Sequence, residues 1–332
     1  MENSNSNVKQ DMQQTFNPPN NDFYEKYGGS MGSPLIMSSP LFFIRHAVSE
    51  YNHQILSLHE EAKSITDKQE KHQRYLEFNS RRDLIDPLLH STGLKQAQDQ
   101  QEFMNQFNYR LIFVSPHRRT LMTAINILKS YQPLSSDDKL QSQTKIKLIL
   151  LPLAKEILNN SNDLACSHEE LRQFCNEKQL QNPQFEFDFS QFEQFQNEYG
   201  VDSWYYQILT NSEKKQMLLD QIRDTNTDAI TIGIKTIIEN NGERIETHAE
   251  VYDRSLMLKK YLNQVIEKEI QNRKFDCNEK ILVVSHSRIM EAFFSEGYDS
   301  RSSMFVNARR FLNCEVVPYQ YETAVKDESL EI

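Results

Sequence analysis

The sequence predicts an α/β domain, a three-layer sandwich in which a mostly parallel central sheet lies between helices. The first observation behind this prediction is that short apolar runs, bounded by polar residues, recur along the chain as buried strands do. The second is that segments with apolar residues at helical spacing lie between these runs. The predicted strands are 41–45, 111–116, 145–153 and 280–287, with 311–319 as a fifth candidate.

Three segments carry the helical pattern most clearly. Ser91 or Thr92 can cap a helix that runs towards residue 107. The segment 118–131 has apolar residues at spacings of three and four, and 251–270 is strongly amphipathic. Helices that follow strands in this order indicate strands running in the same direction.

Two parts of the chain lack this alternation. Residues 1–38 are polar, rich in Asn and Gln, and contain Pro-Pro and Gly-Gly, so we expect a disordered leader followed by one domain over 39–332. Between about 157 and 240 the periodicity weakens and aromatic residues gather at 185–206. We expect this region to be a helical and loop insertion that covers the active site.

Composition limits the classes of function. The formal net charge is −10, which argues against a nucleic-acid-binding protein. No apolar run reaches the ~18–20 residues that cross a bilayer, and the first residues lack the pattern of a secretory signal. The four cysteines have neither metal-ligand spacing nor a CxxC pair, which favours a reducing, cytoplasmic setting without a bound metal.

Three of the predicted strands end in Arg or His. Arg45 and His46 follow the first strand, Arg118 and Arg119 the second, and His286 ends the fourth. Each could be an ordinary polar strand end, and Arg118 could be a solvated neighbour of Arg119. Because ligands bind beyond the carboxyl ends of parallel strands, we instead expect these cations to converge on an anion. Guanidinium forks match the oxygens of phosphate.

Five segments in order resemble the signature of the histidine phosphatase superfamily, also called phosphoglycerate mutase-like. Arg45-His46-Ala47-x-Ser49-x-x-Asn52 resembles RHG-x-S/T-x-x-N. The other segments resemble D-x-x-L-S/T-x-x-G-x-x-QA, SPL-x-RA-x-QTA, L-x-E and VSHG. They are 86–97, 115–124, 153–156 and 284–287.

The resemblance, which spans roughly residues 39–319, implies roles for these residues. His46 would be the nucleophile and would carry a transient phosphohistidine. Arg45, Arg119 and His286 would hold the phosphoryl oxygens, with weaker hydrogen bonds from Ser49 and Asn52. Glu156 would protonate the leaving group, and no metal or other cofactor is implied.

Departures from the family pattern affect the assignment of the acid and of the branch. One extra residue precedes Glu156, which could also be an ordinary acid at a helix start, so Asp163 remains the alternative acid. Other departures from the usual residues are Ala47 for Gly, His90 for Ser or Thr, His117 for Leu, Thr120 for Ala and Ser287 for Gly. His-Ser rather than His-Asp at 286–287 favours the mutase-like branch, branch 1, over the acid phosphatase branch.

Three functions follow from the resemblance. The favoured one is a phosphomonoester hydrolase whose substrate is a small phosphorylated molecule or a phosphoprotein. The first alternative is a phosphoglycerate mutase-type phosphotransferase, which is disfavoured because the insertion is acidic rather than basic. The second alternative is a non-catalytic module that binds a phosphorylated ligand or a protein, which would not need both a nucleophile and an acid.

Overall fold

The computed structural model describes residues 38–133, 145–193, 203–273, 275 and 278–321. The predicted leader lies outside the described residues, except for its last residue. Within the described ranges, no helix combines the length and the apolar character that crossing a bilayer requires.

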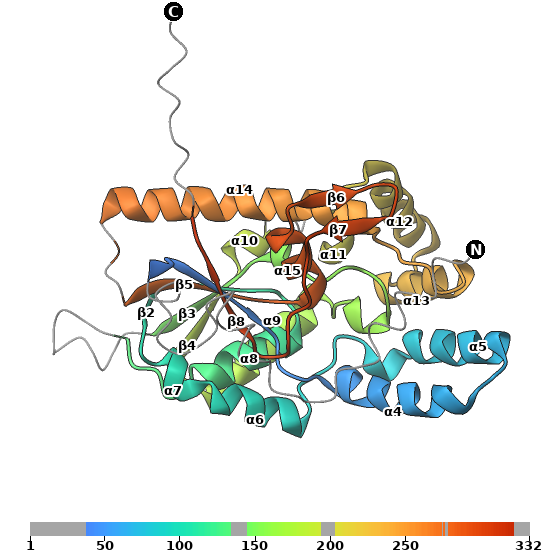
Figure 1. Cartoon of the computed structure of the whole chain (residues 1–332), viewed down its shortest axis with the longest axis horizontal. Helices are drawn as coiled ribbons and strands as arrows, with labels where there is room; N and C mark the ends of the chain where they lie inside the picture. Colours follow the sequence, from blue (N-terminus) through green and yellow to red (C-terminus); the bar gives the residue numbers. More distant parts are fainter. Residues whose placement is uncertain (1–37, 134–144, 194–202, 274, 276–277, 322–332) are drawn as a thin grey trace, which may run out of the picture.

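A central sheet of six strands forms the middle layer, in the order β4-β3-β2-β5-β1-β8 (Figure 1). Five strands are parallel, and β8 pairs with β1 in the antiparallel sense. The mostly parallel α/β sheet predicted from the sequence is therefore confirmed. The strands are β1 Leu41–Arg45, β2 Asn108–Val114, β3 Ile146–Leu150, β4 Phe185–Asp188, β5 Glu279–Ser285 and β8 Val316–Tyr319.

Helices cover both faces of this sheet (Figure 1). On one face lie α6 (Ser91–Asp99), α8 (Arg118–Ile127) and α9 (His168–Gln181). On the other face lie α14 (His248–Asn272) and α15 (Ser287–Phe294). The remaining elements are α4 Glu50–Ser64, α5 Lys68–Asn79, η1 Arg82–Leu84, α7 Gln101–Met104, η3 Pro152–Ala154, η4 Ser161–Asp163, α10 Ser190–Glu193, α11 Trp204–Gln207, α12 Ser212–Thr225, α13 Ala229–Glu239, β6 Gly297–Asp299 and β7 Met304–Val306.

Alternate residues of each central strand supply the two halves of the core. In β1, Phe42 and Ile44 face α6 and α8, whereas Leu41 and Phe43 face α14 and α15. Both sets are completely buried, which is why the strand reads as a continuous apolar run. The sheet therefore has no solvent-facing side here, and ligands can approach only its edges and ends.

Strands β2 and β5 are shifted by one to three residues from the predicted runs 111–116 and 280–287, and two other predicted runs are only partly strand. The run 145–153 forms a strand only over β3, because Pro152 begins the short helix η3. Of 311–319, only β8 is a strand, since Cys314 has a positive φ of 60° that interrupts extended backbone. The region 157–240 contains helices as expected, but it also supplies β4, an edge strand that was not predicted.

Candidate active site

The residues that follow β1, β2 and β5 meet at the carboxyl ends of these parallel strands. In the parallel register, Arg45 pairs with Ser285, and Val114 pairs with Val284. Backbone bonds extend this register past the strand ends, with His46 N donating to Ser285 O at 2.9 Å and Ser115 N donating to Val284 O at 3.0 Å. His46 and His286 consequently face each other with ring centroids 5.1 Å apart.

His46 is held as a neutral ring whose free lone pair is on Nε2. Its Nδ1 lies 2.8 Å from Ala47 O, and a carbonyl can only accept, so Nδ1 carries the proton. Burial, followed by the positive charges of Arg119 and Arg45, holds the pKa of His46 well below its ordinary value. The ring is therefore uncharged at neutral pH, the state that a nucleophilic imidazole requires.

Two buried guanidinium groups flank this imidazole. Arg45 donates from Nη1 to Phe311 O at 2.6 Å. Arg119 donates from Nη1 to Asn162 O at 2.7 Å, and its Nη2 lies 3.4 Å from Asp163 Oδ1. Both positive charges lower the pKa of His46, so they act directly on this ring. Such a pair can bind an anion that reaches this imidazole.

His286 is held by a hydrogen bond to a neighbouring strand end. Its Nε2 lies 2.8 Å from Ser115 Oγ, while Nδ1 is buried and has no hydrogen-bond partner among the residues described. The ring of His117 packs on it edge-on at 4.9 Å. His286 therefore has one ring nitrogen left for an additional ligand.

Glu156 follows η3, lies against the first turn of α15 and is 8% exposed. Its carboxylate accepts hydrogen bonds from Arg288 N, at 3.2 and 3.3 Å, and from Ile157 N at 2.9 Å. These amides hold the carboxylate in one orientation. Because Arg288 comes two residues after His286, Glu156 lies beside the second histidine.

A buried ionic network holds the backbone that carries Glu156. Glu246 accepts from Arg254 Nε at 2.9 Å, from Arg254 Nη2 at 3.1 Å and from Lys155 Nζ at 2.7 Å. Arg254 also donates to the carbonyls of Leu153 and Lys155 at 3.0 and 2.8 Å. Burial opposes ionisation of Glu246, but the charges of Arg254 and Lys155 prevail and lower its pKa to about 2. The long helix α14 is thereby connected to the segment that carries the candidate acid.

Asp163 is also in the site, but its oxygens are already bonded. Oδ2 accepts from the backbone N–H groups of Asn159 and Asn160, and Oδ1 accepts from Asn162 Nδ2 at 3.0 Å and approaches Arg119. Burial, opposed by Arg119 and reinforced by the charge of Glu156, raises the pKa of Asp163 to about 7. These contacts suit a residue that fixes Arg119.

Ser49 and Asn52 are engaged with each other. Ser49 Oγ and Ser49 N both donate to Asn52 Oδ1, and Asn52 N donates back to Ser49 Oγ, which forms the capping box of α4. Their polar groups therefore fix the direction in which the chain leaves His46 and enters α4.

The segment that resembles the second motif supports the loop of residues 46–49, which follows β1. Val48 O accepts from His90 N at 3.0 Å, and Val48 N donates to Gln96 Oε1 at 3.0 Å. An added Cβ at Gly93 would lie 2.0 Å from Val48 O, so only glycine permits this approach. His90, Gly93 and Gln96 thus hold the backbone of Val48, two residues after His46.

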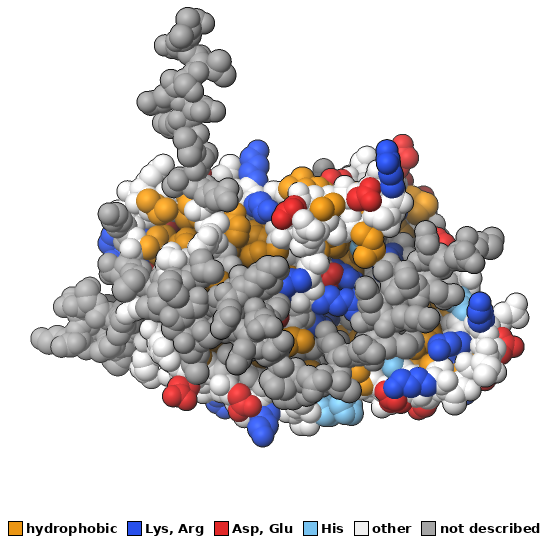
Figure 2. Space-filling model, viewed as in Figure 1, with side chains coloured by type: hydrophobic (Ala, Val, Ile, Leu, Met, Phe, Trp, Pro, Cys, Tyr) orange, Lys and Arg blue, Asp and Glu red, His pale blue; other side chains and the backbone are white. Residues whose placement is uncertain are grey.

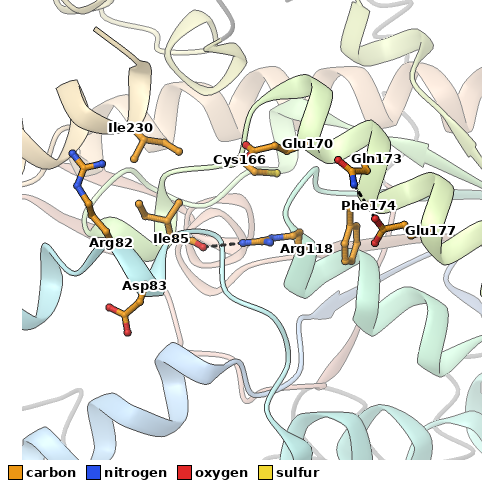
Figure 3. Close-up of a pocket in the computed structure, with 10 residues that line it drawn as sticks. All are labelled: Arg82, Asp83, Ile85, Arg118, Cys166, Glu170, Gln173, Phe174, Glu177 and Ile230. Atoms are coloured by element: carbon orange, nitrogen blue, oxygen red, sulfur yellow. Dashed lines mark hydrogen bonds between the residues drawn. The ribbon is translucent and has the colours of Figure 1, made fainter.

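Asp86 and Arg118 connect this support to α8. Asp86 Oδ1 accepts from Arg118 N at 2.9 Å at the first turn of α8, and Arg118 Nε donates to Asp86 O at 2.8 Å. The Arg118 side chain extends to Ile85 O and lines a cavity of about 450 Å³ between η1, α9 and α13 (Figure 3). Arg118 therefore points to a different region from its neighbour Arg119.

The structure thus brings most of the candidate residues together. Arg45, His46, Arg119, Glu156 and His286 share one site. Ser49 and Asn52 lie at its edge, and the alternative acid, Asp163, contacts it through Arg119. The sequence analysis did not assign Ser115, His117 or Lys155 to the site. For His117 a signal existed, since a histidine stands where the resemblance leads one to expect Leu.

The surface over this region carries positive charge. Figure 2 shows Lys and Arg side chains gathered near the centre of the face, below the β6–β7 hairpin. Among the described residues there is no group of three or more His, Cys, Asp or Glu arranged to hold a metal ion. The donors at the site suit an anion.

Comparison with known proteins gives matches only among solved structures. No protein-family model and no curated protein matches the chain. The structure of mycobacterial glucosyl-3-phosphoglycerate phosphatase is similar at 12% identity, with 84% of this chain and 88% of that chain covered and a TM-score of 0.38. Phosphoglycerate mutase from Bacillus anthracis str. Sterne gives 12% identity, 86% and 94% coverage and a TM-score of 0.36.

A third similar structure is phosphoserine phosphatase from Entamoeba histolytica, in complex with 3-phosphoglyceric acid. It is 16% identical, with 76% of each chain covered and a TM-score of 0.31.

Proposed function

We propose that this protein is a metal-independent phosphomonoester hydrolase of the histidine phosphatase type, which works through a phosphohistidine on His46. The observation that carries the proposal is the state of His46, a neutral ring with its Nε2 lone pair available between Arg45 and Arg119. A neutral imidazole beside two cations is suited to attack on an electron-poor phosphorus whose oxygens are negative.

In the first step, the His46 Nε2 lone pair forms the N–P bond while the bond from phosphorus to the ester oxygen breaks. Glu156 gives its proton to the leaving oxygen. Arg45, Arg119 and His286 hold the three remaining oxygens as their charge redistributes. In the second step, Glu156 takes a proton from water, the water oxygen bonds to phosphorus, and the N–P electron pair returns to His46.

We assign the acid to Glu156 rather than Asp163. Both carboxylates accept hydrogen bonds from backbone N–H groups, but Asp163 also accepts from the Asn162 side chain and pairs with Arg119. These side-chain contacts commit Asp163 to holding Arg119, whereas the recorded partners of Glu156 are backbone groups. Glu156→Gln should slow hydrolysis of an alkyl phosphate at least 10-fold more than that of an aryl phosphate, because only the alkyl oxygen needs a proton on leaving. Asp163→Asn should slow both substrates to a similar extent. The opposite pattern would transfer the acid role to Asp163.

The decisive experiment is hydrolysis of p-nitrophenyl phosphate with chelator present. Wild type should turn over, and His46→Ala should lose at least 10³-fold in kcat, which corresponds to about 4 kcal/mol of barrier. His72→Ala is the matched control, since His72 is exposed and bonds only to Asn241 among the contacts described. Appreciable turnover by His46→Ala would refute the assignment.

Two further measurements separate the proposal from its alternatives. A mutase would require a bisphosphorylated glycerate for activity, whereas the hydrolase should not. A non-catalytic module would bind phosphate without turnover of any ester. We also propose that the substrate is a small phosphorylated molecule or a phosphoprotein, and that the protein works in the cytoplasm, where thiols such as Cys166, Cys175 and Cys314 stay reduced.

A further inference from the structure

His117 occupies a position that connects the second histidine to the rest of the site. It is completely buried, with Nε2 3.3 Å from Asp163 O and Nδ1 3.3 Å from Ser115 Oγ. A backbone carbonyl accepts only, so the Nε2 of His117 carries the proton. Burial and Arg119 hold the pKa of His117 well below its ordinary value, so the ring is neutral and Nδ1 is an acceptor.

The direction of the remaining hydrogen bonds follows from this. Ser115 has one hydroxyl proton, which it donates to His117 Nδ1. The lone pairs of Ser115 Oγ then accept from His286, so the proton of His286 is on Nε2, 2.8 Å away. With these hydrogen bonds, the buried Nδ1 of His286 presents a lone pair rather than a hydrogen.

A lone pair cannot hold a phosphoryl oxygen, which is itself an acceptor. His286 can bind an oxyanion through Nδ1 only after Nδ1 gains a proton, which makes the ring an imidazolium. Burial, Arg119, His117 and His46 keep the pKa of His286 well below its ordinary value when no anion is present. A bound dianion reverses this balance, because it stabilises the imidazolium.

We propose that His117 is a positioning residue which, through Ser115, fixes the tautomer of His286, so that binding of an oxyanion is coupled to the uptake of one proton by His286. This inference rests on the proposed function, because it assigns the oxyanion to the same site. The titratable and charged groups facing His286 are Arg119 from α8, His117 after β2, His46 after β1, Arg254 from α14, and Glu156, which bonds to the first turn of α15.

The test uses inorganic sulfate, which stays dianionic at neutral and alkaline pH and so adds no titration of its own. Calorimetry at pH 8 in buffers with different heats of ionisation counts the protons taken up when sulfate binds. Wild type should take up about one proton, and its affinity should fall about tenfold per pH unit. In His117→Leu, Ser115 is free to donate to His286 Nε2, so a neutral His286 can donate from Nδ1, and the uptake should fall towards zero.

A second variant guards against loss of folding. Ser115→Ala removes the acceptor for His286 Nε2 by an independent substitution and should also reduce the uptake. His59→Leu, which replaces a buried histidine bonded to Tyr75, is the matched control and should keep the wild-type proton count. Long-range proton–nitrogen spectra of protein labelled in its nine histidines report the tautomer of His286 directly in the sulfate-free state.

The outcomes separate this inference from the proposed function. Sulfate binding by wild type without proton uptake, or with equal uptake in His117→Leu, would overturn the role of His117 and leave the phosphate site intact. In the case of equal uptake in His117→Leu, the proton would be taken up by another group, for example His46. Failure of wild type to bind sulfate would overturn the phosphate site itself, together with this inference.

Discussion

Replacing Gly93 with alanine should damage both stability and activity, although it adds only one methyl group. The new Cβ would lie 2.0 Å from Val48 O and 2.9 Å from Val48 N and C. All three are backbone atoms, so no side-chain rotation can relieve the overlap. For the new Cβ to lie even 3.0 Å from this oxygen, either α6 or the loop of residues 46–49 must move by about 1 Å.

The expected cost follows from opposing terms. Alanine gains about 1 kcal/mol over glycine in a helix. Against this, overpacking costs about 1–3 kcal/mol, and disturbing the bond from His90 N to Val48 O adds about 1–3 kcal/mol. We therefore expect a net destabilisation of roughly 1–5 kcal/mol, because the unfavourable terms exceed the helix-propensity gain.

Activity should fall as well, because Val48 is two residues from His46. A misplacement of about 1 Å at a reacting group lowers the rate by roughly 10²-fold. Urea unfolding and the kcat for p-nitrophenyl phosphate measure the two effects. Gly297→Ala is the control, since its Cβ would meet nothing closer than 3.9 Å. Wild-type stability and kcat in Gly93→Ala would refute the close approach.

Three other predictions concern buried charge. The three site histidines have folded-state pKa values well below the ordinary one, so the unfolded chain binds more protons, and stability should fall as pH drops below about 6.5. The raised pKa of Asp163 acts in the opposite direction, because the folded state binds one more proton at this group as the pH falls. Urea unfolding at pH 7.5 and 5.5 would show which effect is larger. A rise in stability at the lower pH would contradict the dominance of the three histidines. Glu246→Gln should lower the free energy of unfolding by about 3–5 kcal/mol, because it leaves Arg254 buried beside a neutral amide. Thermal unfolding measures this loss, and a variant with wild-type stability and activity would contradict the role of the ionic network. Asp86→Ala should lower the free energy of unfolding by about 0.5–2 kcal/mol, because α8 loses the hydrogen bond from Arg118 N to Asp86 at its first turn. An unchanged urea midpoint would show that this bond does not contribute to stability.

Parts of the site could be predicted because the residues of each strand form a recognisable local pattern. The apolar runs of β1, β2 and β5 are buried on both faces, and the Arg and His residues that follow them share an edge once the strands are parallel. The sequence does not show that these strands are adjacent in the order β2-β5-β1, which depends on crossovers of more than 60 residues.

Other parts could not be predicted because their partners are far apart in the chain. Lys155 and Glu246 are 91 residues apart, yet they form a completely buried pair. Strand β4 is only four residues long and lies within an aromatic-rich stretch, so its alternation was too short to distinguish from insertion packing. Asp163 could be named only as an alternative acid, since its saturated hydrogen bonds appear only in three dimensions.

The strand order also constrains how the protein is made. In the described sheet, β1 pairs with β5 and β8, which begin at Glu279 and Val316. The strand that precedes His46 therefore emerges from the ribosome more than 230 residues before either of these partners. During synthesis, β1 is an apolar strand with two open edges, the kind of segment that associates with other chains. Productive folding must wait for the C-terminal strands, and shortening the chain before β5 would leave β1 permanently exposed. The same arrangement delays assembly of the candidate site until β5 and β8 have been synthesised.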